Sequence, residues 1–424
     1  MKKNIVLFLI FIFPFLLNSE IIKLKIKGPI DTITDEYIAN SFNEIKNRTN
    51  PKLIIIEIDT PGGFDTSMRS VIKQIMNSTV PVAVYVSPKG ARAASAGFFI
   101  TVAADIAVMA PGTNMGAAHP VSVTGSKIED TMKEKITNDA ASYIKALAKS
   151  RNRNLDLCEK AVRKSKSYTA KECLKNNLID YIAEDINDLI KQLENKEINM
   201  VNNKKIVLKI KGEKIISIEM SARQKFLRTI TNPNLAYFLL IFGLMGLYLE
   251  FTHAGAIIPG VIGGISLLLA FMAFQILPIN YIGLFLIILS IGFFIAEIKI
   301  QGFGMFGIGG IISFLIGSTI LISSPIPEMR PTMSIIITFT LAFGTIILFL
   351  TYKVITAMKR KTETGKEGLS GEIGVARTDI SPYSGKVFVH GEWWNAFSEE
   401  EIPAGSKVKV ESIEQFKLKV TIIK

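Results

Sequence analysis

The sequence predicts three parts in order: an α/β domain, a multispan α-helical membrane domain and a small all-β barrel. Over residues 20–200, short β-rich runs alternate with helical patterns, which favours a mostly parallel sheet. Between residues 233 and 355, several apolar runs approach the roughly 20 residues that cross a bilayer as a helix. Over residues 365–424, short alternating runs are separated by glycine turns, which is typical of a five-stranded OB-fold barrel.

The composition narrows the classes of partner and cofactor. Of the 424 residues 49% are hydrophobic, and the formal net charge is +12. The lysines form no compact patch interleaved with aromatic residues, so we expect a lipid bilayer and no nucleic acid as partner. Three histidines and two cysteines without metal-ligand spacing predict no metal site and no cofactor. We interpret Cys158 and Cys173 as small buried helix residues rather than as a disulfide.

Residues 1–19 have the pattern of a secretory signal peptide or an uncleaved N-terminal anchor. A basic start at Lys2 and Lys3 precedes an apolar run over residues 5–17. Either interpretation places the following domain, expected over residues 20–200, outside the cytoplasm. The predicted strands of that domain are residues 21–26, 53–58 and 80–86, and the predicted helices are residues 34–46, 66–77, 136–149 and 170–176.

The membrane domain follows a basic, β-leaning segment. We interpret this segment, residues 201–232, as a juxtamembrane linker or a small module. About five spans are then expected at residues 235–249, 256–274, 281–296, 306–322 and 334–352, the first and third being the shortest. Lys353, Lys359 and Arg360 follow the last span and favour its cytoplasmic side. Five crossings also bring the C-terminus inside, although Arg228 before the first span argues mildly against this orientation.

The sequence leaves the roles of two glutamates and two tryptophans open. Glu250 and Glu297 lie near the ends of apolar runs, where a structural or assembly role is favoured over a functional one. In the C-terminal module, Trp393 and Trp394 either form a binding face or pack on the barrel.

Ser95 is the candidate nucleophile. Small residues surround it over residues 90–97, and an apolar, helix-compatible run follows at residues 98–104, so a tight turn would expose its hydroxyl. A helix beginning at Ala96 would direct its amide end towards the serine oxygen, which makes the Ala96 N–H one candidate oxyanion donor. Gly63 is the second, because a glycine in a turn after a buried strand lets the backbone approach without a Cβ clash.

Two residues compete for the role of the base. Lys135 lies 40 residues (135 − 95) after Ser95 at the start of a helical pattern. A lysine accepts a proton only when burial against apolar groups disfavours its ammonium form, and a solvated first-turn lysine is the structural alternative. His119 is the alternative base because imidazole is the commoner general base, although a lone histidine in an apolar loop is more often structural.

The order of several motifs resembles the long form of the NfeD family, the membrane-bound serine proteases of the ClpP class. The motifs cover residues 59–63, 90–97, 109–118, 135–138, 232–237, 255–264, 371–374 and 391–396. The resemblance extends over essentially the whole chain. It implies a ClpP/crotonase-like protease domain, a multispan membrane domain and a cytoplasmic OB-fold domain.

The same resemblance implies a Ser–Lys dyad, which carries over to Ser95 and Lys135, with oxyanion donors at Gly63 and Ala96. Such relatives cut hydrophobic segments of membrane proteins, with stomatin/prohibitin-like proteins as proposed substrates and partners, and their protease domains tend to be dimeric. Soluble ClpP proteases have a histidine near the position of His119, but also an acid that falls near position 165. This chain has a serine there, so the comparison favours the lysine over the histidine.

The leading hypothesis is an integral membrane serine endopeptidase that forms a homo-oligomer, a dimer or higher, with its protease domain outside the cytoplasm and its C-terminal domain inside. The alternative is a non-enzymatic membrane scaffold that partners stomatin/prohibitin-like proteins in microdomains. A third class, acyl transfer or isomerisation, has only the crotonase-type fold in its favour. The presence of both Ser95 and Lys135 favours the protease, since a scaffold needs neither.

Overall fold

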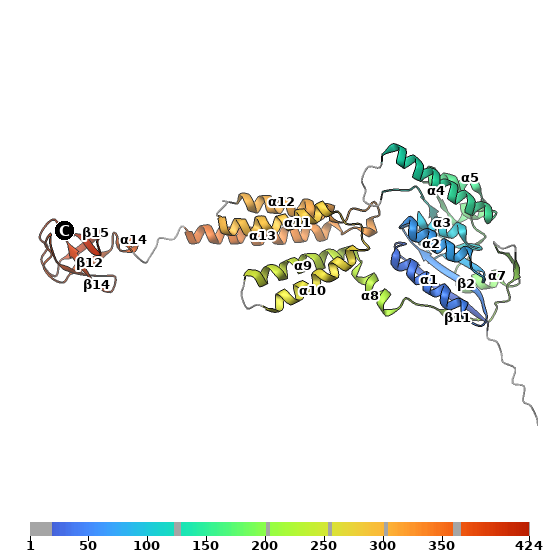
Figure 1. The fold of residues 1–424 in the computed structure, drawn as a ribbon, viewed down its shortest axis with the longest axis horizontal. Helices are drawn as coiled ribbons and strands as arrows, with labels where there is room; N and C mark the ends of the chain where they lie inside the picture. Colours follow the sequence, from blue (N-terminus) through green and yellow to red (C-terminus); the bar gives the residue numbers. More distant parts are fainter. Residues whose placement is uncertain are drawn as a thin grey trace, which may run out of the picture. The chain divides into compact units, whose positions relative to one another are not determined.

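The computed structural model describes residues 19–122, 129–200, 204–252, 257–300, 304–358 and 366–423. The chain divides into two compact units, Met1–Ser290 with Ile312–Thr340, and Ile291–Ile311 with Leu341–Lys424. Figure 1 labels the elements along the chain. The expected signal or anchor lies, except for Ser19, outside the described residues.

A six-stranded parallel sheet forms the centre of the N-terminal domain. Its strand order is β11-β1-β2-β3-β5-β8, and each neighbouring pair is parallel. The strands are β1 (Glu20–Lys27), β2 (Pro51–Asp59), β3 (Val82–Val86), β5 (Ile106–Met109), β8 (Tyr181–Ile182) and β11 (Lys214–Ser217). The central strands are almost continuously apolar because both faces of a parallel sheet are covered. The predicted α/β class is confirmed.

Helices cover both faces of this sheet (Figure 1). They are α1 (Thr32–Lys46), α2 (Asp65–Met76), α3 (Ala96–Ala103), α4 (Asp130–Ser150), α5 (Leu155–Arg163), α6 (Ala170–Lys175) and α7 (Ile186–Leu193). Ile54 and Ile56 of β2 point into the core beneath α1 to α6, whereas Leu53 and Ile55 point into the core beneath α7. The predicted strands and helices of this domain all form, but α4 begins at Asp130, before the predicted start at residue 136, so Lys135 lies within the helix rather than at its start.

A second, three-stranded sheet lies at the carboxyl end of β2. It consists of β4 (Arg92–Ala94), β6 (Asn114–Gly116) and β7 (Ser167–Thr169), with β4 and β6 parallel and β6 and β7 antiparallel. Thr60, directly after β2, pairs with Ala93 of β4. The carboxyl edge of a parallel sheet is where ligands of such folds usually bind, so this small sheet marks the candidate site.

The segment before the membrane helices belongs in part to the main sheet. After the short hairpin β9 (Glu197–Asn199) and β10 (Lys205–Val207), strand β11 pairs with β1 over four residues. Helix α8 (Ala222–Ile230) follows. Residues 201–232, expected as a linker or small module, thus supply an edge strand, because β11 completes the hydrogen bonds of β1.

Five apolar helices follow. They are α9 (Pro233–Thr252), α10 (Ile257–Phe274), α11 (Tyr281–Ile300), α12 (Met305–Leu321) and α13 (Met333–Met358). Among the described residues, Pro233–Glu250, Ile257–Phe274 and Pro327–Ile346 are long and apolar enough to cross a membrane, while Tyr281–Glu297 and Met305–Leu321 are shorter. The first apolar run is therefore longer than predicted, because its helix begins already at Pro233, a residue favoured at the first helical position.

The helices α9–α10 and α11–α12 are two copies of one hairpin pattern. Residues 47 positions apart match, including Glu250 with Glu297, Gly260 with Gly307 and Ser266 with Ser313. Both carboxylates also lie close to a glycine of the second helix of their hairpin. A side chain at Gly260 would meet the Glu250 carboxylate, and the Glu297 carboxylate accepts hydrogen bonds from the N–H groups of Gly304 at 2.7 Å and of Gly307 at 3.1 Å. Both carboxylates therefore lie where one helix of a hairpin meets the start of the next, which is the structural role favoured for them.

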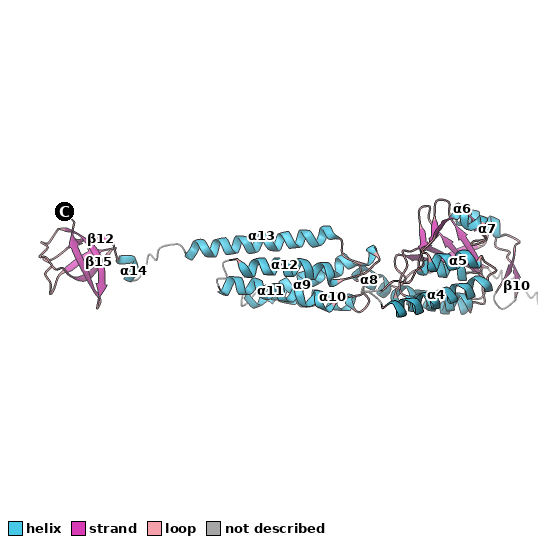
Figure 2. Ribbon diagram, turned by 90° about the horizontal axis from the view of Figure 1, so that it is seen from above, coloured by secondary structure: helices cyan, strands magenta, loops and turns pink. Residues whose placement is uncertain are grey.

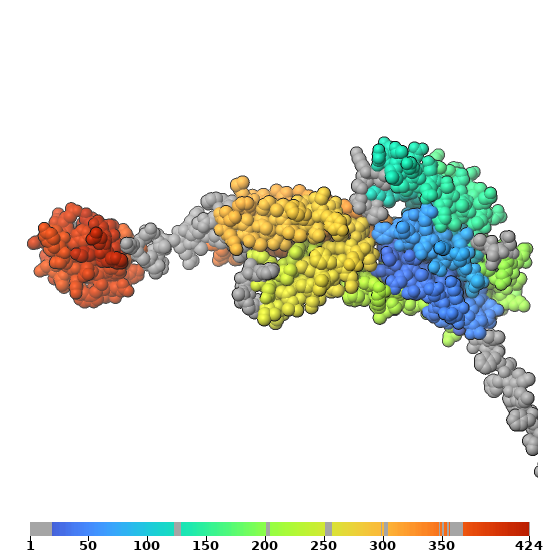
Figure 3. Space-filling view, viewed as in Figure 1, coloured from blue at the N-terminus to red at the C-terminus, as the bar shows by residue number. Residues whose placement is uncertain are grey.

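The C-terminal module is a closed five-stranded barrel (Figure 2). After the short helix α14 (Lys366–Leu369), its strands are β12 (Ile373–Ala376), β13 (Lys386–Val389), β14 (Glu392–Phe397), β15 (Lys407–Glu414) and β16 (Lys417–Ile422). Trp394 packs against the barrel core, whereas Trp393 is 63% exposed. The barrel forms a rounded body (red in Figure 3). The predicted OB-fold class is confirmed.

Candidate active site

Ser95 occupies a strained turn between β4 and α3. Its backbone has φ +50° and ψ −115°, a conformation that is rare for residues other than glycine and that concentrates at functional sites. The Ser95 N–H donates a hydrogen bond of 2.9 Å to the carbonyl of Gly116 on β6, which fixes the turn. A strand, a sharp turn and a helix N-terminus together present the hydroxyl, as in a nucleophile elbow.

The small residues around Ser95 are required by close packing. A Cβ on Gly62, which has φ +120°, would lie 2.6 Å from the Ser95 Cβ. A Cβ on Gly97 would lie 2.4 Å from the Thr60 methyl group. The structure therefore places the diglycine turn directly against the serine, as the two motifs predicted.

Both candidate oxyanion donors carry available N–H groups. Ala96 is the first residue of α3, so its N–H has no partner within the helix. The Gly62 carbonyl accepts the Ile30 N–H at 2.8 Å. Because the N–H and C=O of a trans peptide point in opposite directions, the Gly63 N–H faces away from Ile30. Among the described residues, no hydrogen bond uses either of these two N–H groups.

Two arginines hold the other end of α3. The Arg151 Nε donates to the Ala103 carbonyl at 2.7 Å, and the buried Arg153 donates to the carbonyls of Val102 and Ala104 at 3.2 Å each. Cations at a helix C-terminus satisfy its unpaired carbonyls and complement the helix dipole. The sequence analysis missed both arginines, because their partners are about 50 residues away and share no local pattern with them.

The two candidate bases differ in their exposure and in their contacts. Lys135 is exposed on the first turns of α4, whose buried residues begin only at Ala140. The His119 Nδ1 lies 3.0 Å from the Val162 carbonyl, and its ring is half-buried. Within the described part of the chain, neither side chain contacts Ser95, and residues 123–128 before α4 lie outside that part. The structure brings together the serine and the two amides, but not the base.

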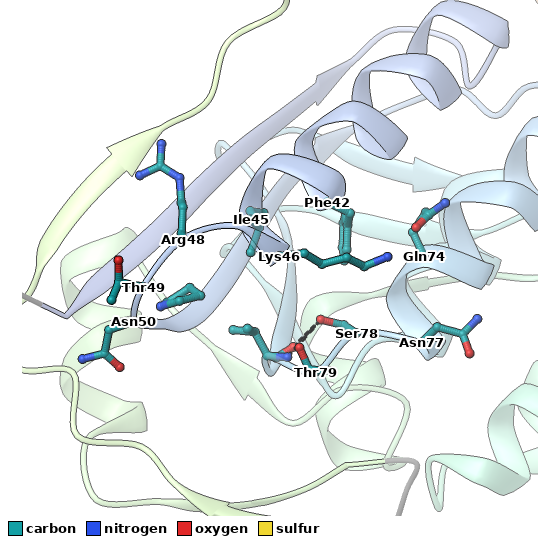
Figure 4. Close-up of a pocket in the computed structure, with 12 residues that line it drawn as sticks. Phe42, Ile45, Lys46, Arg48, Thr49, Asn50, Gln74, Asn77, Ser78 and Thr79 are labelled. Carbon is teal, nitrogen blue, oxygen red and sulfur yellow. Dashed lines mark hydrogen bonds between the residues drawn. The ribbon is translucent and has the colours of Figure 1, made fainter.

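A pocket elsewhere in this domain contains none of these residues. It has a volume of about 250 Å³ and lies between the C-terminal ends of α1 and α2 and the starts of β2 and β3, lined among others by Lys46, Asn50, Asn77 and Val80 (Figure 4). This is the amino edge of the sheet, opposite to the edge where α/β folds usually bind ligands. The pocket is therefore separate from the candidate site.

The two cysteines are not reactive groups. Cys158 and Cys173 are both buried and free, which confirms that they form no disulfide. Burial raises the pKa of each thiol to about 12, so the thiolate required for nucleophilic attack is disfavoured. Ser95 remains the nucleophile candidate of this domain.

Each part of the chain matches a family model. The NfeD1b N-terminal domain matches residues 20–203. The NfeD integral membrane domain matches residues 234–353, and the NfeD-like C-terminal, partner-binding domain matches residues 366–421. The order of these matches is the order of the three parts of the structure.

Two relatives match along nearly the whole chain. The membrane-bound protease PH1510 of Pyrococcus horikoshii is 35% identical over 419 residues, which cover 94% of this chain and 92% of that protein. The membrane protein NfeD1b of Bacillus subtilis is 27% identical over 406 residues, covering 89% of this chain and 87% of that protein.

Solved structures match about half of the chain. A serine-to-alanine variant of the 1510-N membrane-bound stomatin-specific protease has 34% identity and a TM-score of 0.45, covering 48% of this chain and 99% of that one. A lysine-to-alanine variant in complex with a substrate peptide has 32% identity and a TM-score of 0.46, covering 50% and 98%. With three consecutive family domains and a full-length relative at 35% identity, the chain belongs to the NfeD family.

Proposed function

We propose that this protein is a membrane-bound serine endopeptidase that cleaves hydrophobic segments of membrane proteins, stomatin-like proteins among them. The observation that carries the proposal is the strained turn at Ser95, which packs against the diglycine turn and directly precedes the unpaired N–H of Ala96. A relative of nearly the same length is named a membrane-bound protease, which supports the same activity.

In the proposed mechanism, the Ser95 hydroxyl attacks the carbonyl carbon of the substrate peptide bond while Lys135 accepts its proton. The N–H groups of Gly63 and Ala96 hold the oxyanion of the tetrahedral intermediate. Lys135 then returns the proton to the leaving amine, and water hydrolyses the acyl-enzyme with the same lysine as base. His119 is not used, because the acid that would orient a histidine base has no counterpart near position 165, where this chain has a serine.

Lys135 reaches this role only when the first turns of α4 are covered. Met132 and Ile136, within one turn of Lys135, are 50% and 38% exposed, so the lysine lies on a partly apolar helix surface. An apolar substrate segment or a second copy of the chain would cover this surface and exclude water from the lysine. We therefore include a homo-oligomer, a dimer or higher, in the proposal.

The proposed location rests on the apolar helices and on the positive residues that follow the last of them, Lys353, Lys359 and Arg360. The protease domain lies outside the cytoplasm and the barrel lies inside, with the membrane helices between them. The barrel, which matches a partner-binding domain, binds a stomatin/prohibitin-like partner on the cytoplasmic side.

The test is cleavage of a peptide with the apolar C-terminal sequence of a stomatin-like protein by the full chain in detergent. We expect Ser95→Ala and Lys135→Ala to lower kcat by at least about 10³-fold and His119→Ala to remain within about threefold of the native protein. Cleavage by purified Ser95→Ala at the native rate would refute the protease. Loss with His119→Ala and retention with Lys135→Ala would replace the lysine by the histidine.

A further inference from the structure

We propose that Arg228, on the helix next to the membrane, is a positioning residue for the oxyanion site. Through Asp31 and Ile30 it connects α8 to the diglycine turn that carries the Gly63 N–H. This inference rests on the proposed function and adds to it a route by which the membrane segment sets the geometry of the active site.

The first link is a bidentate ion pair. The Arg228 guanidinium donates to the two Asp31 carboxylate oxygens at 2.7 and 3.0 Å. The side chain of Asp31 is 4% exposed and that of Arg228 is 24% exposed. A bidentate pair with one buried partner is directional and sensitive to the loss of either side, unlike a pair at the surface.

The second link is the short segment that precedes α1. Asp31 caps this helix by accepting the Thr34 N–H at 3.0 Å. The Thr34 hydroxyl accepts a hydrogen bond from Arg228 at 2.7 Å and donates one to the Pro29 carbonyl at 3.0 Å. Arg228 therefore contacts both side chains that hold residues 29–31 in place.

The third link is Ile30 itself, which is fully buried. Its N–H donates to the Gly62 carbonyl, and its carbonyl accepts the Phe64 N–H, each at 2.8 Å. A Cβ on Gly63 would lie 2.1 Å from the Ile30 carbonyl oxygen. Since Ile30 touches the turn on both sides of Gly63, a shift of Ile30 moves the Gly63 N–H.

On the membrane side, α8 passes into α9 with almost no connecting chain. Only Thr231 and Asn232 lie between them. The Asn232 side chain caps α9 by accepting the N–H groups of Asn234 at 3.0 Å and of Leu235 at 3.3 Å. A tilt of the first membrane helix is thus transmitted to α8 and to Arg228.

The serine side of the site has a parallel connection. Arg92, on β4 three residues before Ser95, forms an ion pair with Glu328, in the segment between α12 and α13. Both side chains are nearly half exposed, so this pair is the weaker one. Each of the two loops that form the site nevertheless has a charged connection to the membrane part of the same unit.

The test compares two ion pairs that join the same two helices. Arg223 of α8 also pairs with α1, through Glu36 at 2.7 Å, but Arg223 is 68% exposed and Glu36 makes no contact with residues 29–31 among the hydrogen bonds of the described chain. We would measure kcat and KM of the full chain in detergent with the same peptide, for Arg228→Gln, Arg228→Lys and the control Arg223→Gln, and the thermal unfolding of each.

We expect Arg228→Gln to lower kcat about tenfold, or 1.4 kcal/mol, with KM within about twofold, because an oxyanion donor acts in the transition state. Arg228→Lys should recover part of the loss, since it keeps the charge without the bidentate geometry. Arg223→Gln should stay within about twofold of the native kcat. A native kcat in Arg228→Gln, or an equal loss in Arg223→Gln, would overturn the inference.

If Arg228→Gln does not fold, the kcat of Arg228→Lys alone tests the inference. A lowered kcat at native unfolding temperature supports the inference, and a native kcat refutes it. Failure of the inference is distinct from failure of the proposed function. If only the inference fails, Ser95→Ala is inactive and Arg228→Gln is fully active. If the proposed function fails, Ser95→Ala is active.

Discussion

Ser95 depends on the absence of side chains around it. Its left-handed backbone is held by one hydrogen bond to Gly116, and its Cβ occupies the space that a side chain on Gly62 would fill. A site of this kind tolerates no added methyl group, because the backbone atoms around it cannot move without displacing the hydroxyl.

Gly62→Ala tests this dependence. The new methyl group would meet Ser95 at 2.6 Å, so we expect kcat to fall by at least about 10²-fold. The control is Gly112→Ala, at a glycine with φ +75° and open space around it, which carries only the backbone cost of about 1–2 kcal/mol in unfolding free energy. Peptide cleavage and thermal unfolding would be measured for both, and equal activity in the two variants would show that contact with Ser95 is not limiting.

The residues of the candidate site that could be predicted are those marked by a short sequence pattern, such as a turn or a helix start. Ser95, Ala96 and Gly63 were proposed as site residues from small residues beside a strand end and a helix start, and the structure brings the two motifs into contact. Asp31 and Arg228 were not identified as a pair, because they lie 197 positions apart. Long-range ion pairs leave no periodic pattern, whereas turns and helix starts do.

At the scale of the elements, helix α3 is held in position by contacts at its ends. Its first residue, Ala96, has an N–H without a partner among the described residues, and its last carbonyls accept hydrogen bonds from Arg151 and Arg153. The helix has only eight residues, too few to be stable alone, so its position depends on these contacts and on its fully buried apolar residues.

Arg153→Met should therefore destabilise the domain. The arginine donates to three carbonyls at 3.2 Å and to Asp180 at 2.9 Å while 5% exposed. Its removal takes the donor from the three carbonyls and leaves Asp180 with only the Ala107 N–H, at a cost of about 3–5 kcal/mol. Arg163→Gln, which breaks an exposed pair with Glu159, should change the unfolding free energy by less than about 1 kcal/mol. Denaturant unfolding followed by circular dichroism measures both. Similar values for the two would mean that α3 does not depend on this cap.

Strand β11 differs from the expectation, because it belongs to the main sheet rather than to a linker or a separate module. Its residues alternate weakly, and its isoleucines are only half-buried at the edge of the sheet, so the pattern showed β propensity without showing a partner. Edge strands are generally harder to assign than central ones such as β2, because only one side of their backbone is paired. The five apolar helices and the barrel strands were predictable, since their signals extend over whole elements.

At the scale of the whole molecule, the proposed orientation makes a direct prediction. With the protease domain outside and the barrel inside, a fluorescent protein fused after Lys424 should fluoresce in cells, and alkaline phosphatase at the same position should remain inactive. The control is the same pair of fusions after Ile230, at the end of α8, where the outcome should be reversed. An active phosphatase at the C-terminus would show that the chain crosses the membrane an even number of times after α8.

The repeated hairpin has a consequence for this topology. Each copy, α9–α10 and α11–α12, is a pair of antiparallel helices, so it returns the chain to the side from which it entered, whether it crosses fully or penetrates only part of the bilayer. The shorter apolar lengths of α11 and α12 therefore do not affect the side on which the C-terminus lies. In the proposed orientation that side is decided by α13, which has no partner copy among the described helices, so we expect removal of this helix to leave the barrel on the same side of the membrane as the N-terminal domain.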